Sequence, residues 1–253
     1  MIGGPFGAVR GALSFLTRLP VGYRDGDWIA FRSRPAAFPV VGYVAGALAA
    51  LPLLAAGALP APTVALGYIL AVYAVLGIHH IDGIADLGDA LVVHGDVDRR
   101  REILKDTTTG VGALLAVSLV VAALALGGLA LAGLPAFRAV GVAVAAEVGT
   151  KLGMAAMACF GRASYEGMGR QFTAAATPGR FVAPAAVALP AVALTWPTPT
   201  AAVALCGALA GIALPWYWAN RFLGGINGDI FGAANEIGRV VGVHAGVIAW
   251  TLL

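Results

Sequence analysis

The chain has 253 residues, of which 60% are hydrophobic and 11% are charged, with a net charge of +3. Soluble domains are about 45–50% apolar and about 25% charged, so this composition excludes an ordinary water-soluble protein. It also excludes a disordered chain, which needs low hydrophobicity and high charge. The 16 basic and 13 acidic residues are too few and too balanced for a nucleic-acid-binding surface. The two cysteines have no CxxC partner, so no cysteine-based zinc site or disulfide framework is predicted.

The apolar residues are arranged in runs that can cross a membrane. Residues 6–20 carry two arginines and no cleavage site, so they predict an amphipathic helix on the membrane surface. A bilayer core of about 30 Å takes about 20 apolar residues per helix. Seven runs approach or exceed that length: 37–58, 61–79, 111–133, 139–160, 181–197, 199–219 and 237–253. The sequence predicts an all-α polytopic membrane bundle of about seven transmembrane helices, in a single domain over 1–253 with an interfacial N-terminal segment over 1–36.

Charged residues gather on one side of these runs. Fourteen of the 16 basic residues and 12 of the 13 acidic residues lie in the N-terminal segment or in and next to the polar segments 80–110, 161–180 and 220–236. Because positive charge marks the cytoplasmic side of a membrane protein, we expect these segments to face the cytoplasm from the cell (inner or plasma) membrane. Polar groups gathered at one surface favour an interfacial enzyme over a transporter, which distributes them along a path through the bilayer.

One acid and one base lie inside a predicted span. Glu147 and Lys151 are four residues apart, on one face of the helix. Intramembrane charges are costly unless they are paired or hydrated, so we expect both to face the protein interior. The pair fits a structural role better than a substrate contact, and the sequence leaves both open.

The strongest chemical signal is an acidic stripe at the helix end that continues the second predicted span, in GIHHIDGIADLGDAL over 77–91. Asp82, Asp86 and Asp89 are spaced i, i+4 and i+7, which places them on one helical face. Three such carboxylates repel one another unless something compensates their charge. A divalent cation such as Mg²⁺ is the natural candidate, since it prefers carboxylate oxygens. The arginines at 99–101, or simple solvation of a helix end, are the alternatives.

Glycines and histidines accompany the stripe. Gly83 and Gly88 weaken a helix but allow a bulky ligand to approach. His79 and His80 are typical of hydrogen-bonding residues at a helix end, and metal ligation is the less favoured interpretation.

A basic segment follows the stripe, in DVDRRREILKDTTTGVGAL over 96–114. Arg99, Arg101 and Lys105 are candidate phosphate-binding residues, because arginine and lysine donate hydrogen bonds to phosphate oxygens. Anchoring to lipid headgroups is the alternative for the arginines. Asp106 adjoins Lys105 and is a candidate substrate contact.

Two further polar segments add candidates. In NRFLGGINGDIFGAANEIGR over 220–239, Asp229 and Glu236 are seven apart and could form a second acidic wall, with Asn227 beside them. The segment GRASYEGMGRQF adds Glu166. A structural role for any one loop is plausible, but three charged, glycine-rich loops on one face indicate a ligand. A carboxylate stripe with basic loops suggests metal-assisted phosphoryl transfer.

In this ordered set of motifs the chain resembles the cobalamin (5′-phosphate) synthases, the adenosylcobinamide-GDP ribazoletransferases. The resemblance covers nearly the whole chain. It rests on ALSFLTRLPV (12–21), FPVVGYVAG (38–46), HHIDGIADLGDAL (79–91), EILKDTTTGVGAL (102–114), YEGMG (165–169) and GGINGDIFGAANEIG (224–238). Each motif alone is weak, whereas the ordered set is specific.

The resemblance implies an integral membrane enzyme that needs Mg²⁺. It implies that the enzyme joins adenosylcobinamide-GDP to α-ribazole, or to its 5′-phosphate, and releases GMP. It also implies that Asp82, Asp86 and Asp89 form the family's acidic motif and that Asp229 belongs to its C-terminal acidic motif. Lys105 and Asp106 match its lysine–aspartate pair.

From these matches we expect the metal to be held by Asp82 and Asp86. Asp89 completes the metal site or takes the proton from the attacking hydroxyl, and Asp229 is a second candidate for either task. The chain departs from the family at Asn227 and Thr107, where threonine and serine are usual, which leaves the phosphate contacts less defined.

A CDP-alcohol phosphotransferase is the main competing prediction, since such enzymes also use an aspartate-rich helix and a metal. Their motif requires an Ala-Arg pair that Asp82-Gly83 lacks, since Ile84, Ala85 and Asp86 follow. A metal or corrinoid transporter is less favoured. The sequence leaves the homo-oligomeric state open, although Gly42/Gly46 and Gly207/Gly211 permit close helix packing.

Overall fold

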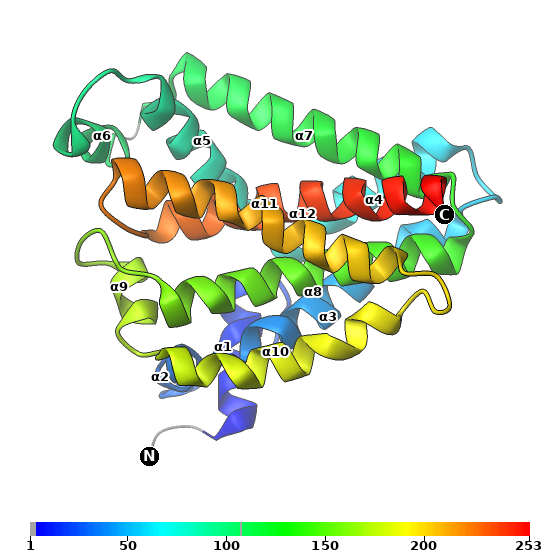
Figure 1. The fold of residues 1–253 in the computed structure, drawn as a ribbon, viewed down its shortest axis with the longest axis horizontal. Coiled ribbons are helices and arrows are strands. Elements are labelled where there is room, and N and C mark those ends of the chain that lie inside the picture. Colours follow the sequence, from blue (N-terminus) through cyan, green and yellow to red (C-terminus); the bar gives the residue numbers. More distant parts are fainter. Residues whose placement is uncertain (1–3, 107) are drawn as a thin grey trace.

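The computed structural model describes residues 4–106 and 108–253, and regular structure in these ranges is helical (Figure 1). The α-helices are α1 (Pro5–Leu16), α2 (Asp27–Ser33), α3 (Ala37–Ala49), α4 (Ala61–Leu76), α5 (His79–Val92), α6 (Val97–Ile103), α7 (Val111–Ala132), α8 (Ala136–Phe160), α9 (Met168–Thr173), α10 (Val182–Ala188), α11 (Thr200–Phe222) and α12 (Gly228–Leu252). Short 3₁₀ helices are η1 (Leu51–Ala55), η2 (Pro178–Phe181) and η3 (Leu189–Ala193). The all-α prediction is confirmed.

Four helical segments are long and apolar enough to span a membrane, so this is a multi-pass membrane protein. They are Ala37–Ala55, Val111–Ala132, Ala136–Phe160 and Thr200–Phe222, and α4 with α5 makes a fifth if the two are counted as one bent span. Each of the seven predicted runs is helical in the structure, but the count of seven membrane spans is not confirmed.

Three predicted runs differ from the helices that form. The run 181–197 is divided into η2, α10 and η3, and Pro184 and Pro190 lie within it; proline removes a helical hydrogen bond. The run 237–253 is the second part of α12, which begins nine residues earlier, at Gly228. The run 61–79 ends at Leu76.

The end of α4 changes the direction of the chain. Gly77 has a φ of 75°, a backbone conformation that favours glycine, and α5 leaves it at 95° to α4. The acidic stripe is therefore a separate helix, and not the continuation of the second span that the sequence predicted. The bend lays α5 between α12 and α7.

Helix α8 forms the centre of the bundle and packs against α3, α11 and α12. In its most apolar stretch 94% of the residues are buried, against 22% for α7, which lies at the periphery (Figure 1). Gly42 and Gly46 bring α3 against the backbone of α8, and Gly207 and Gly211 bring α11 against α12. Both small-residue pairs thus serve packing within the chain.

The N-terminal helix predicted over 6–20 forms as α1, but it packs against α2 and α3. The buried carboxylate of Asp27 accepts hydrogen bonds from Arg10 Nε and Nη2, at 2.6 and 2.7 Å. Gly11 allows the contact, because a Cβ there would lie 2.5 Å from the Asp27 carbonyl oxygen.

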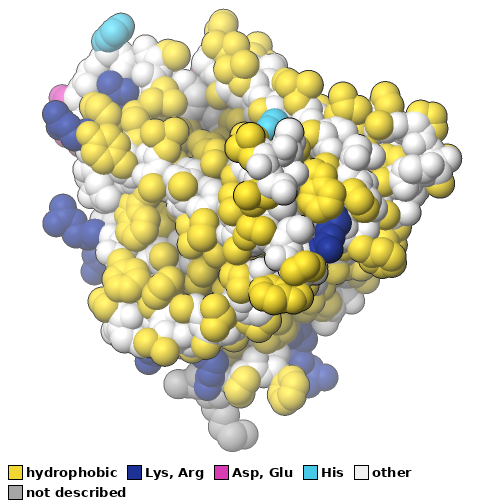
Figure 2. Space-filling model, turned by 45° about the vertical axis from the view of Figure 1, so that its right-hand side comes forward, with side chains coloured by type: hydrophobic (Ala, Val, Ile, Leu, Met, Phe, Trp, Pro, Cys, Tyr) yellow, Lys and Arg dark blue, Asp and Glu magenta, His cyan; other side chains and the backbone are white. Residues whose placement is uncertain are grey.

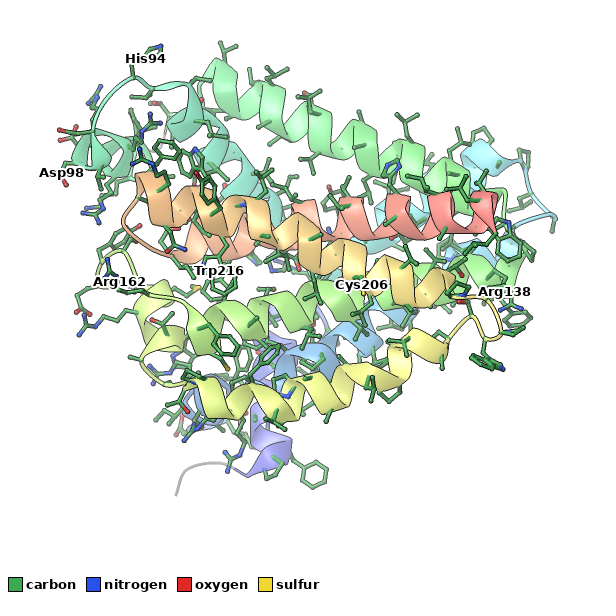
Figure 3. The ribbon with its side chains drawn as sticks, viewed as in Figure 1. His94, Asp98, Arg138, Arg162, Cys206 and Trp216 are labelled. Atoms are coloured by element: carbon green, nitrogen blue, oxygen red, sulfur yellow. The ribbon has the colours of Figure 1, made fainter. Side chains whose placement is uncertain are left out.

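Charged side chains gather at one end of the bundle. Figure 3 places His94, Asp98 and Arg162 at the end formed by α6 and α9, and Arg138 at the opposite end beside the C-terminus. Figure 2 shows hydrophobic side chains over most of the face it draws. This surface is the one expected for a protein whose sides contact lipid.

Candidate active site at the acidic face of α5

A polar cavity of about 320 Å³ opens beside the acidic face of α5. It is lined by Asp82, Ala85, Asp86 and Asp89 of α5, by Leu104, Lys105, Asp106, Thr108 and Thr109 from the segment between α6 and α7, and by Ala113 of α7. The sequence prediction that the stripe and the lysine–aspartate pair share one site is therefore geometrically consistent. Thr107 lies outside the described residues.

Two glycines bring α5 close to its neighbours. A Cβ at Gly83 would collide with the backbone carbonyl oxygen of Asp229, at the start of α12. A Cβ at Gly88 would lie 2.6 Å from the carbonyl oxygen of Gly112, at the start of α7. Without side chains at these positions, the beginnings of α12 and α7 reach the acidic face.

The close crossing at Gly83 concentrates negative charge. Burial, together with the charges of Asp229, Asp82 and Asp89, raises the pKa of Asp86 to about 7. Burial and the charge of Asp82 raise the pKa of Asp229 to about 6, although a hydrogen bond from Asn227 opposes the shift. Sequence spacing predicted that Asp82, Asp86 and Asp89 share one face of α5. The approach of Asp229 to that face depends on the packing of α5 against α12.

Asp89 is hydrogen-bonded to the backbone of α7. Its Oδ2 accepts from the Gly110 amide at 2.8 Å and its Oδ1 from the Ala113 amide at 2.9 Å. A carboxylate in this position satisfies amides that have no partner within the helix and favours the positive end of the helix dipole. Asp89 therefore fixes the entry of α7 beside the cavity.

A chain of contacts links Asp229 to the lysine of the cavity. Asn227 caps α12 by accepting from the Ile230 amide at 3.0 Å, and it donates to Asp229 Oδ2 at 2.7 Å. It also donates to the Tyr165 hydroxyl at 3.0 Å, and the Lys105 ammonium lies 5.5 Å from the centre of the Tyr165 ring. Sequence reasoning missed Tyr165, because its hydrogen bond with Asn227 joins positions 62 residues apart and no local pattern marks it.

Asp106 and three other predicted residues make contacts within their own loops or with the backbone. The Asp106 carboxylate accepts from the amide and hydroxyl of Thr108, at 2.9 and 2.8 Å. Arg99 pairs with exposed Glu102 at 2.9 Å. Arg101 donates to the carbonyl oxygens of Leu223 and Ser164. Glu166 forms an exposed pair with Arg170 at 2.9 Å. Arg99, Arg101 and Glu166 do not line the polar cavity, and their predicted phosphate contacts stay predictions.

Glu236 lies in a different environment from Asp229, in a buried ionic cluster between α8 and α12. Arg239 contacts the carboxylates of Glu236, at 2.7 Å, and of Glu147. Lys151 contacts Glu147, at 3.5 Å, and Asn235. The Glu147–Lys151 pair faces the interior as predicted, and four ionised groups of balanced charge lower the cost of burial.

The side chains of the polar cavity fit a magnesium ion that is shared with a substrate, and not one held by the protein alone. Within residues 4–106 and 108–253, no group of three or more His, Cys, Asp and Glu side chains is arranged so that it could hold a metal ion. Mg²⁺ is, however, commonly bound by one or two carboxylates together with substrate phosphates. Asp82 and Asp86 supply two such carboxylates, and Asp86 carries a raised pKa that a cation would lower. The residues therefore fit an ion shared with a phosphate-bearing substrate.

Asp229 lines a second, mostly apolar cavity of about 440 Å³. Its walls come from α1, α3, α5, α8, α9 and α12, and they include Phe15, Phe38, Phe172 and Phe231. Asp229 thus lines this cavity while its charge raises the pKa of Asp86 in the polar cavity, and the charge of Asp82 raises the pKa of Asp229.

Comparison with known proteins gives one consistent answer. The sequence pattern of the family described as cobalamin-5-phosphate synthase matches residues 8–247. A Halorubrum lacusprofundi protein named adenosylcobinamide-GDP ribazoletransferase is 49% identical over 253 residues, covering 96% of this chain and 98% of the relative. Proteins of the same name from Halobacterium salinarum and Methanocella arvoryzae are 56% and 31% identical, covering 78% and 99% of this chain and 99% of each relative. No solved structure matches the chain. The chain belongs to the cobalamin-5-phosphate synthase family.

Proposed function

We propose that the chain joins adenosylcobinamide-GDP to α-ribazole, or to α-ribazole 5′-phosphate, and releases GMP. The product is adenosylcobalamin or its 5′-phosphate. Family membership and the printed names of the relatives support the substrates. The observation that carries the chemistry is that Asp82, Asp86 and Lys105 line one polar cavity, while the charge of Asp229, which lines the second cavity, acts on Asp86.

The reaction is a phosphoryl-group substitution. A ribose hydroxyl oxygen of the acceptor attacks the phosphorus that is attached to the corrinoid side of the diphosphate. The bond from that phosphorus to the bridging oxygen breaks, and the electron pair leaves with GMP. The hydroxyl proton passes to a carboxylate, which must lie within hydrogen-bond reach of it.

The residues of the polar cavity have separate tasks in this proposal. Asp82 and Asp86 hold Mg²⁺, which when bound neutralises charge on the diphosphate and on the departing GMP. Lys105 binds a diphosphate oxygen. Asp89 holds the entry of α7 beside them through its two backbone hydrogen bonds, and its predicted contact with the cation stays a prediction.

Asp229 is the preferred proton acceptor. It lines the second cavity, so it can meet a hydroxyl that approaches from that side. The Asn227 amide holds one of its oxygens at 2.7 Å and thereby orients the carboxylate. A pKa of about 6 keeps the group mostly ionised at neutral pH and makes it a better base than an ordinary aspartate.

The chain is proposed to lie in the cell membrane with the polar cavity toward the cytoplasm. The support is the positive-inside rule, together with the separation of the charged loops from Arg138 in Figure 3. The water-soluble nucleotide product would then leave directly into the cytosol.

The test is an assay of the purified chain in detergent with adenosylcobinamide-GDP, α-ribazole and Mg²⁺, with GMP and corrinoid product measured separately. The proposal expects equal amounts of both, and neither without α-ribazole. A parallel reaction with a CDP-alcohol donor should release no CMP. CMP release without corrinoid product would support the competing phosphotransferase assignment and overturn this one.

A further inference from the structure

The second cavity, which Asp229 lines, has the walls of an aromatic binding site. Phe172 is the central ring of this wall, with its ring centroid 5.5 Å from those of both Phe38 and Phe231 and 6.2 Å from that of Phe15. These four rings come from four different helices and belong to one contiguous cluster. Aromatic walls of this kind bind flat ring systems by offset and edge-to-face stacking.

One polar group in this cavity lacks a partner. His80 lines the cavity and is only 7% exposed. Its Nδ1 atom is buried and has no hydrogen-bond partner among the described residues. A buried, unsatisfied ring nitrogen costs free energy unless a ligand or a water satisfies it. The cavity therefore combines aromatic walls with four polar side chains, Ser14, His79, His80 and Asp229, of which His80 has a ring nitrogen without a partner among the described residues.

The charges around the cavity restrict what can enter. Among its described lining residues there is no lysine or arginine, and the one carboxylate is Asp229. A phosphate buried here would lack a cation and would meet a negative charge. The volume of about 440 Å³ lies in the range of pockets that enclose small organic ligands, whereas a corrinoid ring system is much larger.

We propose that this cavity binds the aromatic base and ribose of the acceptor nucleoside, with His80 as the hydrogen-bonding partner of the base and Asp229 beside the attacking hydroxyl. This inference rests on the proposed function. It assigns the acceptor to the cavity lined by α1, α3, α8, α9, α12 and the His79–His80 end of α5, and the GDP-activated donor to the polar cavity lined by the α5 carboxylates and Lys105. The base specificity of the enzyme then depends on His80 and the four phenylalanines.

In this proposal the acceptor and the GDP-activated donor meet beside one carboxylate, that of Asp229. The hydroxyl proton transfers to Asp229 as the new oxygen–phosphorus bond forms, and the phosphorus–oxygen bond to GMP breaks on the polar side. A pocket that hydrogen-bonds a heteroatom discriminates strongly against analogues that lack it, because the buried partner is then left unpaired. We therefore expect an indole riboside, which lacks the second ring nitrogen of a benzimidazole riboside, to bind less tightly.

The experiment measures equilibrium binding of α-ribazole alone to the purified chain in detergent, by calorimetry, with no donor present. The change His80→Phe keeps an aromatic ring and removes both nitrogens, so it should weaken α-ribazole binding roughly tenfold, the cost of one buried hydrogen bond. The variant should also lose the preference for the benzimidazole over the indole riboside. The matched control is His94→Phe, in the exposed loop after α5 (Figure 3), which should bind as the wild type does.

A second variant protects the test against misfolding. Phe172→Leu removes the central ring and should weaken α-ribazole binding, whereas Phe160→Leu, at a half-exposed ring outside the cavity, should not. Neither cavity change should move the KM for adenosylcobinamide-GDP more than about twofold. Unchanged α-ribazole binding in both cavity variants, or a rise in the donor KM instead, would overturn the inference. GMP release by the wild type would in that case still support the proposed function. Absence of GMP release from a wild-type chain that binds α-ribazole would overturn the function instead.

Discussion

At the scale of single residues, the three carboxylates of the stripe are not equivalent. Asp82 is exposed, Asp86 is half-buried with a pKa of about 7, and Asp89 accepts two backbone hydrogen bonds. Their spacing places them on one face, but their surroundings give them different properties. The acidic face therefore combines one residue that holds a helix in place with two that are available to a ligand.

Asp86→Asn should stabilise the protein without metal while abolishing its activity. The folded-state pKa of Asp86, about 7, lies above its ordinary value of 3.8, so its charged form costs stability, fully so above pH 7. Without Mg²⁺ at pH 8 the variant should unfold about 2–4 °C higher than the wild type, and this difference should shrink as the pH is lowered to 5. Addition of Mg²⁺ with donor should raise the melting temperature of the wild type only. A variant less stable than the wild type at pH 8 would contradict the assigned charge repulsion.

Asp89→Ala should destabilise the fold, since it removes the acceptor of the Gly110 and Ala113 amides. Loss of a helix cap costs about 1–2 kcal/mol. Thermal unfolding in detergent should show this loss, and Asp82→Ala, at an exposed position of the same helix, serves as the control. Equal stability of the two variants would show that the α7 entry does not depend on Asp89.

At the scale of elements, the site depends on how closely α5 crosses α12. The crossing is set by Gly83, whose missing side chain admits the Asp229 carbonyl. The bend at Gly77 turns α5 into this position. Neither glycine contacts a substrate in our proposal, but both determine whether Asp229 can act together with Asp82.

Gly83→Ala should separate α5 from α12 and lower turnover roughly tenfold or more, because small displacements of reacting groups are costly. Overpacking of this kind also costs about 1–3 kcal/mol. The control is Gly179→Ala in η2, where an added Cβ meets nothing within 4 Å. Wild-type turnover of Gly83→Ala, measured as GMP release, would contradict the role given to this crossing.

At the scale of the whole molecule, composition and charge predicted the helical membrane bundle, and the acidic stripe with Lys105 was predicted because these residues are close in sequence. Contacts between distant segments were not accessible in this way. The helical spacing of Asp229 and Glu236 suggested a shared wall, but Glu236 pairs with Arg239 of the same helix inside the bundle, and Arg239 also contacts Glu147 of α8. The bend at Gly77 and the contact between Asn227 and Tyr165 likewise follow from tertiary packing.

The orientation of the bundle can be tested by cysteine labelling in a Cys206→Ser background, since Cys206 is exposed on α11. Asp98→Cys lies at the α6 end, and Gly133→Cys lies in the exposed turn before α8 at the opposite end. A membrane-impermeant maleimide added to intact cells should label Gly133→Cys only. Asp98→Cys should react after permeabilisation. The reverse pattern would place the polar cavity outside the cytoplasm.

The most direct test of the central claim is Mg²⁺-dependent GMP release from adenosylcobinamide-GDP and α-ribazole by four proteins. The wild type and Asp98→Asn, whose carboxylate is exposed on α6, should turn over at similar rates. Asp82→Asn and Asp229→Asn should each lose activity at least about a hundredfold while remaining folded, because one removes a proposed metal ligand and the other the proposed base. Full activity in either variant would contradict an active centre shared by α5 and the start of α12.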